Sequence, residues 1–178
     1  MTAVSGPKRT PLYEVHKRLG ARMVEFGGYT LPVQYSSIRE EHAAVRESAG
    51  LFDVSHMGQL ALTGPGAISA AERIFSRGVA AIAPGRIRYG MLCNEDGGVV
   101  DDVTCYRTAE DSVFWCVNAS NIKKDQRWIE RHCPDGAQLR NDSDDTAMFA
   151  LQGPASAEVL GKVCPAGAGA LRRYRFER

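Results

Sequence analysis

Residues 93–103 read Cys-Asn-Glu-Asp-Gly-Gly-Val-Val-Asp-Asp-Val and predict a hairpin turn that leads into a strand. Asp96-Gly97 is a strong short-range hairpin signal, because glycine accepts the positive φ that a primed turn requires. The segment after the turn is rich in Val, Thr and Tyr, which favour strands. Aspartate is depleted in strands, so Asp101 and Asp102 break the local pattern. Such exceptions tend to mark functional or strained sites.

Neighbouring strand residues point to opposite faces of a sheet, so Asp101 and Asp102 cannot act together as a carboxylate dyad. We expect one of them to meet a ligand, and the other to meet solvent, an arginine or backbone amides. A ligand role is supported by Tyr89 and Asn118, which lie at the ends of strands that we expect beside the Asp strand. The alternative is a salt-bridged or solvent-facing pair on an edge strand, with Asn118 as the N-cap of the next helix.

The overall composition is ordinary for a soluble globular protein, with 44% hydrophobic and 24% charged residues. The 22 basic and 21 acidic residues give a net charge of +1, so no strong field favours nucleic acid or an anionic membrane. The longest apolar runs are too short to span a bilayer, and residues 1–10 lack the apolar core of a secretion signal. We therefore expect a cytoplasmic protein that binds neither nucleic acid nor membrane.

The cysteines predict free thiols in a reducing compartment, because their number is odd and no Cys-x-x-Cys pair occurs. The four histidines are scattered, so the sequence shows no cluster at metal-ligand spacing and predicts no metal. The cysteines are Cys93, Cys105, Cys116, Cys133 and Cys164.

Hydrophobic spacing predicts several helices and strands. Helices are expected over 11–19 and 121–132, and Ser37 to Glu40 fits a capping box that starts another. In the helix at 121–132 the inward side chains are expected to be Ile122, Trp128 and Ile129. Strands are expected over 89–94, 99–107 and 113–118.

A short internal sequence repeat indicates how these elements are arranged. Residues 61–65 (Ala-Leu-Thr-Gly-Pro) and 150–154 (Ala-Leu-Gln-Gly-Pro) each predict a strand that ends in Gly-Pro before a helix. Helices that alternate with antiparallel hairpins favour an α+β fold, in which helices pack on one face of antiparallel sheets. We expect the split β-α-β (ferredoxin-like) form of this fold.

The predicted domain organisation has three parts. Residues 1–50 form an N-terminal helical segment and loop region, and residues 51–170 form the α+β domain. Residues 171–178 resemble the start of a further strand, in which Tyr174 and Phe176 alternate with charges. The sequence stops there with no turn or cap, so we expect a truncated chain.

Several segments together resemble the aminomethyltransferase (T-protein) family of the glycine cleavage system. They occur in the family's order across nearly the whole chain. The matching segments are 9–13 (Arg-Thr-Pro-Leu-Tyr), 51–58 (Leu-Phe-Asp-Val-Ser-His-Met-Gly), 94–102, 117–121 (Val-Asn-Ala-Ser-Asn) and 150–154.

The resemblance implies a transferase of glycine catabolism and one-carbon metabolism. Its partner is the lipoylated H-protein, which supplies the lipoyl group, and its co-substrate is tetrahydrofolate. The reaction gives 5,10-methylenetetrahydrofolate, ammonia and dihydrolipoyl H-protein. Asp102 matches the family's catalytic aspartate, while Met57, Tyr89 and Asn118 match positions that line the folate cavity. The α+β domain would then bind folate, and Asp101 would have a structural role.

The sequence departs from the family in length, since the family continues for roughly as long again. The absent part includes a Gly-Tyr-Thr-Gly-Glu segment whose glutamate helps to hold the pterin. We therefore expect this chain alone to be inactive or to need a second chain.

Two other functions remain open from the sequence. One is the folate domain of an enzyme such as a sarcosine or dimethylglycine dehydrogenase, which a neighbouring flavin domain would favour. The other is a non-catalytic folate-binding module. The acidic side chain at position 102 favours catalysis over simple binding.

Overall fold

The structure is a computed structural model that describes residues 6–164 and 167–177. Contacts divide these residues into two compact units. The first unit joins the N-terminal part, up to residue 56, to the segment from 147 to 170, and the second joins 57–146 to the segment from 171 onward. The limits 1–50, 51–170 and 171–178 divide the chain differently, and as domain boundaries they stay a prediction.

The second unit is built on a five-stranded antiparallel sheet with the strand order β6-β7-β8-β5-β9. Along the chain, β5, α3, β7, β8, α4 and β9 form two split β-α-β units, and β6 adds an edge strand. The predicted α+β, ferredoxin-like arrangement is therefore confirmed. The elements are β5 (Gly58–Thr63), α3 (Ala67–Ile74), β6 (Arg86–Cys93), β7 (Val99–Ala109), β8 (Ser112–Val117), α4 (Ile122–Arg131) and β9 (Gln138–Asn141).

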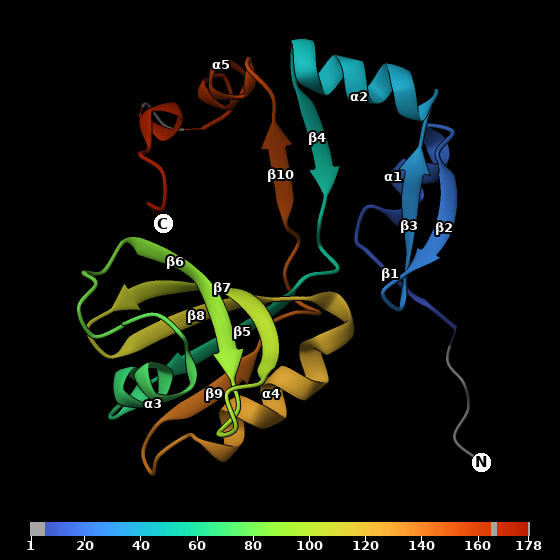
Figure 1. Ribbon diagram of the computed structural model, residues 1–178. Coiled ribbons are helices and arrows are strands. Elements are labelled where there is room, and N and C mark those ends of the chain that lie inside the picture. Colours follow the sequence, from blue (N-terminus) through green and yellow to red (C-terminus); the bar gives the residue numbers. More distant parts are fainter. Residues whose placement is uncertain (1–5, 165–166, 178) are drawn as a thin grey trace. The chain divides into compact units, whose positions relative to one another are not determined.

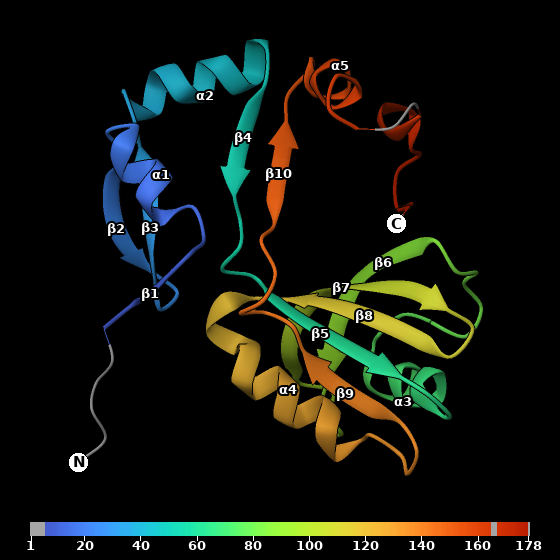
Figure 2. The ribbon, with the colours of Figure 1, turned by 180° about the vertical axis from the view of Figure 1, so that it is seen from behind.

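One face of this sheet carries the hydrophobic core. Alternate side chains of β5 and β8 are fully buried there, among them Leu60, Leu62 and Trp115. Helices α3 and α4 cover this face (Figure 1, Figure 2) and contribute Ile74 and Ile129. The inward position predicted for Ile129 is thus confirmed. Because side chains alternate, the opposite face carries the other set of strand residues, including Asp102.

The hairpin between β6 and β7 closes as a turn from Asn94 to Gly97. Gly97 has a φ of 80°, and its N–H donates to the carbonyl of Asn94 at 3.1 Å. The positive φ expected at Gly97 is therefore present, but this glycine is the fourth residue of the turn and does not lie within a two-residue primed loop. A second bond, from Asn94 N to Gly98 O at 2.9 Å, completes the connection.

The first unit contains two small sheets, with the orders β1-β3-β2 and β10-β4. Strands β1 and β3 are parallel, while the other pairs are antiparallel. A buried pair, His16 Nε2 and Asp53 Oδ2 at 2.9 Å, ties α1 to β4. The elements are β1 (Lys8–Arg9), α1 (Tyr13–Arg18), β2 (Arg22–Phe26), β3 (Tyr29–Gln34), α2 (Ile38–Glu47), β4 (Gly50–Asp53), β10 (Phe149–Gln152) and α5 (Ser156–Gly161).

The capping box predicted before α2 is half formed. The hydroxyl of Ser37 accepts the backbone N–H of Glu40 at 3.2 Å, as a capping box requires. The returning carboxylate is that of Glu41, whose Oε1 accepts the N–H groups of Tyr35 at 2.6 Å and Ser36 at 2.9 Å. The Ser37 bond satisfies an amide of the first helical turn that has no intrahelical partner, and Glu41 binds the two residues that precede the cap.

The repeated Gly-Pro segments have the same local form in the two units. Gly64 ends β5 with a φ of 96° before α3, and Gly153 ends β10 with a φ of 114° before α5. The internal sequence repeat therefore corresponds to two equivalent strand-to-helix turns.

Residues 171–177 do not form the predicted strand. They make one isolated antiparallel bridge, between Arg175 and Arg86, and Tyr174 has a φ of 58°. Residue 178 lies outside the described residues. No helix in the described part of the chain has the length and apolar character needed to cross a membrane.

Candidate functional site

Asp102 lies on β7, and its side chain is on the exposed face of the five-stranded sheet. On β6, Tyr89 pairs with Thr104, two residues along β7 from Asp102, so the two side chains share a face. The hydroxyl of Tyr89 donates to Oδ2 of Asp102 at 3.1 Å. This hydrogen bond and the negative charge of Asp102 raise the pKa of Tyr89, so the phenol stays protonated and remains a donor.

Asn118 follows β8 and holds the second oxygen of Asp102. Its Nδ2 group donates to Oδ1 of Asp102 at 3.2 Å and to the carbonyl of the same residue at 3.0 Å. The side chain of Asn118 makes no hydrogen bond to the helix that follows, so it does not act as an N-cap. The site therefore contains a carboxylate that two neutral donors orient.

Met57 occupies the end of the adjacent strand. It is half-buried and precedes Gly58, which pairs with Val117 at the end of the β5–β8 ladder. Met57 and Asn118 each lie one residue beyond this last pair of the ladder, so they are neighbours across the two strands. The structure brings all four predicted site residues to one region of the second unit.

Asp101 points to the other face, as alternation predicts, and is only 4% exposed. Its Oδ1 accepts the side-chain amides of Asn118 at 3.1 Å and Asn121 at 2.6 Å. Its Oδ2 accepts the backbone N–H of Asn118 at 3.2 Å. One asparagine side chain therefore links the buried carboxylate to the exposed one.

A second buried carboxyl group, that of Asp125 on α4, meets Asp101. Asp125 is 0% exposed, and no N–H or hydroxyl group of the described residues donates to either of its oxygens. Burial, the hydrogen bond with Asp101 and the negative charge of Asp101 raise the pKa of Asp125 to about 8. Asp125 is therefore a neutral acid at pH 7, and its carboxyl O–H donates a hydrogen bond to the Asp101 carboxylate.

Asp101 remains ionised despite its location. Burial by itself raises the pKa of this carboxyl, but the hydrogen bonds that it accepts outweigh burial and hold the pKa below its ordinary value. The donors are Asp125, Asn118 and Asn121. The result is a chain of hydrogen bonds from Asp125 through Asp101 and Asn118 to Asp102.

Asn121 and Asp125 also belong to this network, although neither was predicted from the sequence as a site residue. The signal was present in helical spacing, because Asp125 lies between Ile122 and Ile129 on the inward face of α4. A charged residue on an apolar helix face requires a buried partner, and Asp101 on the facing sheet is that partner.

Two of the five thiols, those of Cys105 and Cys116, are buried. All five cysteines are free, and burial raises the pKa of Cys105 to about 12, so this thiol stays neutral. Among the described residues, no three His, Cys, Asp or Glu side chains are grouped in a way that could hold a metal ion.

The GCVT N-terminal domain family matches residues 12–178 of this chain. An aminomethyltransferase of Halothermothrix orenii is 46% identical over 169 residues, which are 95% of this chain and 47% of that protein. An aminomethyltransferase of Lysinibacillus sphaericus is 47% identical over 171 residues, which are 96% of this chain and 47% of that protein. The chain thus spans about half the length of the curated relatives it matches.

Two solved structures are similar in fold. The glycine cleavage system aminomethyltransferase T from Bartonella henselae is 33% identical with a TM-score of 0.88, over 94% of this chain and 46% of that chain. The heterotetrameric sarcosine oxidase from Corynebacterium sp. U-96 is 22% identical with a TM-score of 0.52, over 72% of this chain and 63% of that chain. The second likeness shows the fold alone.

Proposed function

This chain belongs to the family of the GCVT N-terminal domain, and we propose that it provides the catalytic aspartate and part of the folate site of an aminomethyltransferase of the glycine cleavage system. The observation that carries the proposal is the geometry of Asp102. Its carboxylate is held by Tyr89 at 3.1 Å and Asn118 at 3.2 Å on the exposed face of the sheet. Relatives named aminomethyltransferase, each matched over about half its length, support the same conclusion.

The site suits tetrahydrofolate as co-substrate. The reacting region of a reduced folate presents N–H groups, and a carboxylate is an acceptor for such donors. Both oxygens of Asp102 retain acceptor capacity beyond the single side-chain bond that each accepts from Tyr89 or Asn118. Tetrahydrofolate would supply the nitrogen nucleophiles, and Met57 would form part of the apolar wall.

The proposed reaction balances without an oxidant. The aminomethyl group, carried as a thioether-type adduct on the lipoyl arm of H-protein, gives its carbon to the folate. The C–S bond and the C–N bond to the amine both break, and two C–N bonds to folate nitrogens form. The two protons lost from the folate nitrogens go to the lipoyl thiolate and to the departing ammonia.

Asp102 has two roles in this proposal. Positive charge develops at the transferred carbon as ammonia leaves, and a fixed anion stabilises that charge without reorganisation. The same carboxylate holds the co-substrate in an attacking orientation. Tyr89 and Asn118 keep the carboxylate in place, and the buried Asp101 in turn fixes Asn118.

The wider setting follows from the same proposal. The protein would bind lipoylated H-protein as its partner. It would take part in glycine catabolism, in the cytoplasm. The folate-binding role assigned to residues 51–170 belongs to this proposal as well.

The test is ammonia release from aminomethylated H-protein, measured with and without tetrahydrofolate. The protein is expected to release ammonia much faster when the folate is present. Folate binding, seen as a thermal shift, without folate-dependent release would instead identify a non-catalytic folate-binding module. Absence of both signals would refute the proposal.

A further inference from the structure

The buried carboxyl group of Asp125 takes no part in the proposed reaction steps. Asp125 lies on α4, is 0% exposed and meets Asp101, which is 4% exposed on β7. Apart from Asp101, no group of the described residues forms a hydrogen bond with either oxygen of Asp125. Two buried carboxylates in contact would repel one another, so this contact requires a proton on one of them.

The surroundings of the two carboxyl groups decide which one holds that proton. Asp101 accepts three N–H donors, which belong to Asn118 and Asn121, at distances of 2.6 to 3.2 Å. These donors stabilise the ionised form of Asp101, whereas Asp125 has no such donor. The proton therefore resides on Asp125, in agreement with its pKa of about 8.

Other charged groups do not compensate an ionised Asp125. Lys124, its neighbour in α4, acts to lower the pKa of Asp125, but the Nζ group of Lys124 donates to the carbonyl of Val100 at 2.5 Å. Strand β5 and the short helix η1 (Ala119–Asn121) pack against α4 and contain no charged residue. The charged residues of the other two elements that pack against α4 are exposed to solvent; they are Glu72 and Arg73 of α3 and Arg140 of β9.

Asn118 transmits the state of this buried pair to the exposed face of the sheet. Its Nδ2 group carries two protons but has three acceptors: Oδ1 of Asp101 at 3.1 Å, and the carbonyl and Oδ1 of Asp102 at 3.0 and 3.2 Å. The two aspartates therefore compete for one amide. A neutral Asp125 donates to Asp101 and lowers its demand on Asn118. An ionised Asp125 withdraws that donor, so Asp101 draws the amide more strongly and Asp102 loses an orienting bond.

We propose that Asp125 is a positioning residue for Asp102 and acts only while its own carboxyl group is protonated. It acts through Asp101 and Asn118 and touches no substrate. This inference rests on the proposed function, because its effect on the rate is exerted at Asp102. Loss of the Asp125 proton at alkaline pH would then lower the rate of ammonia release.

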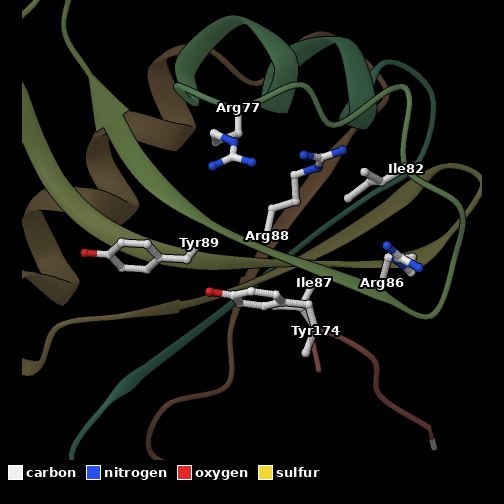
Figure 3. Close-up of a pocket in the computed structure, with 7 residues that line it drawn as sticks. All are labelled: Arg77, Ile82, Arg86, Ile87, Arg88, Tyr89 and Tyr174. Atoms are coloured by element: carbon white, nitrogen blue, oxygen red, sulfur yellow. The ribbon is translucent and has the colours of Figure 1, made fainter. Parts of the chain in front are cut away.

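Tyr89, the other donor to Asp102, does not titrate in the same range. Its hydrogen bond to Asp102 and the charge of Asp102 raise its pKa above the ordinary value of about 10. Figure 3 shows Arg77 and Arg88, which line a small pocket with Tyr89, on the other side of β6 from its ring. Arginine keeps its proton throughout this range. A variant that cannot titrate at position 125 therefore identifies the group responsible for a change in rate near pH 8.

Folate-dependent ammonia release, measured from about pH 6.5 to about pH 9.5, tests the inference. The comparison is with Asp125→Asn, which keeps a donor toward Asp101 but has no proton to lose. Dividing the rate of the unaltered protein by that of the variant cancels the pH effects that belong to folate and H-protein. We expect this ratio to fall about tenfold between pH 7 and pH 9, because about nine tenths of Asp125 is ionised one pH unit above its pKa of about 8.

Two further variants separate the donor from other effects of substitution. Asp125→Ala removes the donor and is expected to lower the rate about tenfold already at pH 7, whereas Asp125→Asn should retain most of it. Glu130→Gln is the matched control, since it removes an exposed carboxylate from the same helix. Its rate is expected to follow the pH profile of the unaltered protein.

The side-chain amide of Asn118 gives a second readout that needs no turnover. In NMR spectra of the unaltered protein, its two proton resonances are expected to shift with a midpoint near pH 8. In Asp125→Asn they are expected to stay constant over the same range. The first of these spectra requires no variant, so it tests the inference even if a substitution prevents folding.

The outcomes separate this inference from the function on which it rests. A constant rate ratio, with folate-dependent release intact, would overturn the inference and leave the proposed function standing. Resonances of Asn118 that do not change between pH 7 and pH 9 would also overturn it, because Asp125 would then have no link to the site. Absence of folate-dependent release at every pH would remove the proposed function, and the inference with it.

Discussion

Asp101 and Asp102 are chemically identical neighbours, yet the sheet gives them different environments. Alternation buries Asp101 at 4% exposure and leaves Asp102 on the open face. Asp101 accepts hydrogen bonds from Asn118, Asn121 and Asp125, so it joins the end of β8 and helix α4 to β7. Asp102 accepts from Tyr89 and Asn118 and keeps acceptor capacity for a ligand. The difference between a structural and a catalytic carboxylate therefore arises from one step along a strand.

Replacing Asp102 with alanine is expected to lower the rate of folate-dependent ammonia release by at least ~10²-fold, which is typical for removal of one electrostatic stabiliser. The fold should survive, because the side chain is exposed and lies outside the core. Steady-state rates and a circular dichroism spectrum check the two parts. Glu95→Ala is the matched control, since it removes an exposed carboxylate from the same hairpin. Near-normal turnover of Asp102→Ala would eliminate the catalytic role.

The Asp125 carboxyl makes stability depend on pH. Its pKa is about 8 in the folded protein and about 3.9 in the unfolded chain, so the folded state binds the extra proton between these values. The neutral acid contributes fully to the free energy of unfolding below about pH 4. This contribution is lost as the pH rises to about 8, by at most ~1.4 kcal/mol per pH unit.

Asp125→Asn keeps a donor toward Asp101 but does not titrate. Relative to this variant, the unaltered protein is expected to lose stability steadily between pH 5 and about pH 8. Urea unfolding at several pH values measures the free energy of unfolding of both proteins. A constant difference across this range would mean that Asp125 is already ionised in the folded protein.

Turns between elements depend on glycines for two separable reasons. Gly97 has a φ of 80°, and a Cβ there would meet no atom within 4 Å, so only backbone strain opposes a side chain. Gly64 has a φ of 96°, and a Cβ there would lie 2.8 Å from the carbonyl oxygen of Gly136. The first position therefore tests strain alone, and the second tests strain together with a backbone clash.

We expect Gly97→Ala to lower the free energy of unfolding by about 1–2 kcal/mol, the cost of a left-handed conformation for an L-residue. Gly64→Ala is expected to cost more, because carbonyl groups of the backbone cannot move aside as a flexible side chain can. Thermal unfolding of both variants measures the order. Equal losses would show that the turn after β5 relaxes without cost.

The second unit holds the main hydrophobic core and both tryptophans. Trp115 is fully buried, and its ring lies 5.1 Å from that of Phe75 between centroids. Trp128 packs against the same core. Tryptophan fluorescence therefore reports on the packing of this unit.

Leu62→Ala is expected to lower the free energy of unfolding by about 2–5 kcal/mol, as for other buried leucines. Leu62 is 0% exposed and belongs to the core cluster, so its removal leaves a cavity. Urea unfolding followed by tryptophan fluorescence measures the loss. Val99→Ala, at a position that is 63% exposed, serves as control and should change stability by no more than about 0.5 kcal/mol. Similar values for the two variants would contradict the assignment of the core.

Much of the local structure could be predicted because it depends on neighbours in sequence. The apolar spacing of Ile122 and Ile129 specified the inward face of α4, and Gly97 required a turn that only glycine adopts without strain. Alternation placed Asp101 and Asp102 on opposite faces. The predicted strand after residue 170 was wrong. Tyr174 and Phe176 do alternate with charged residues, but the backbone of this segment forms only one isolated bridge, between Arg175 and Arg86.

Pairings between distant segments depended on tertiary structure. The sequence by itself determined several of the elements, the class of fold and the opposite faces of Asp101 and Asp102, because these follow from periods of two and 3.6 residues. Only the folded chain decided that Asn118 links the two carboxylates, that Asp125 stays protonated beneath them and that Arg77 and Arg88 line a pocket with Tyr89. The physical reason is that desolvation and hydrogen-bond geometry depend on distances between atoms that sequence separation does not specify.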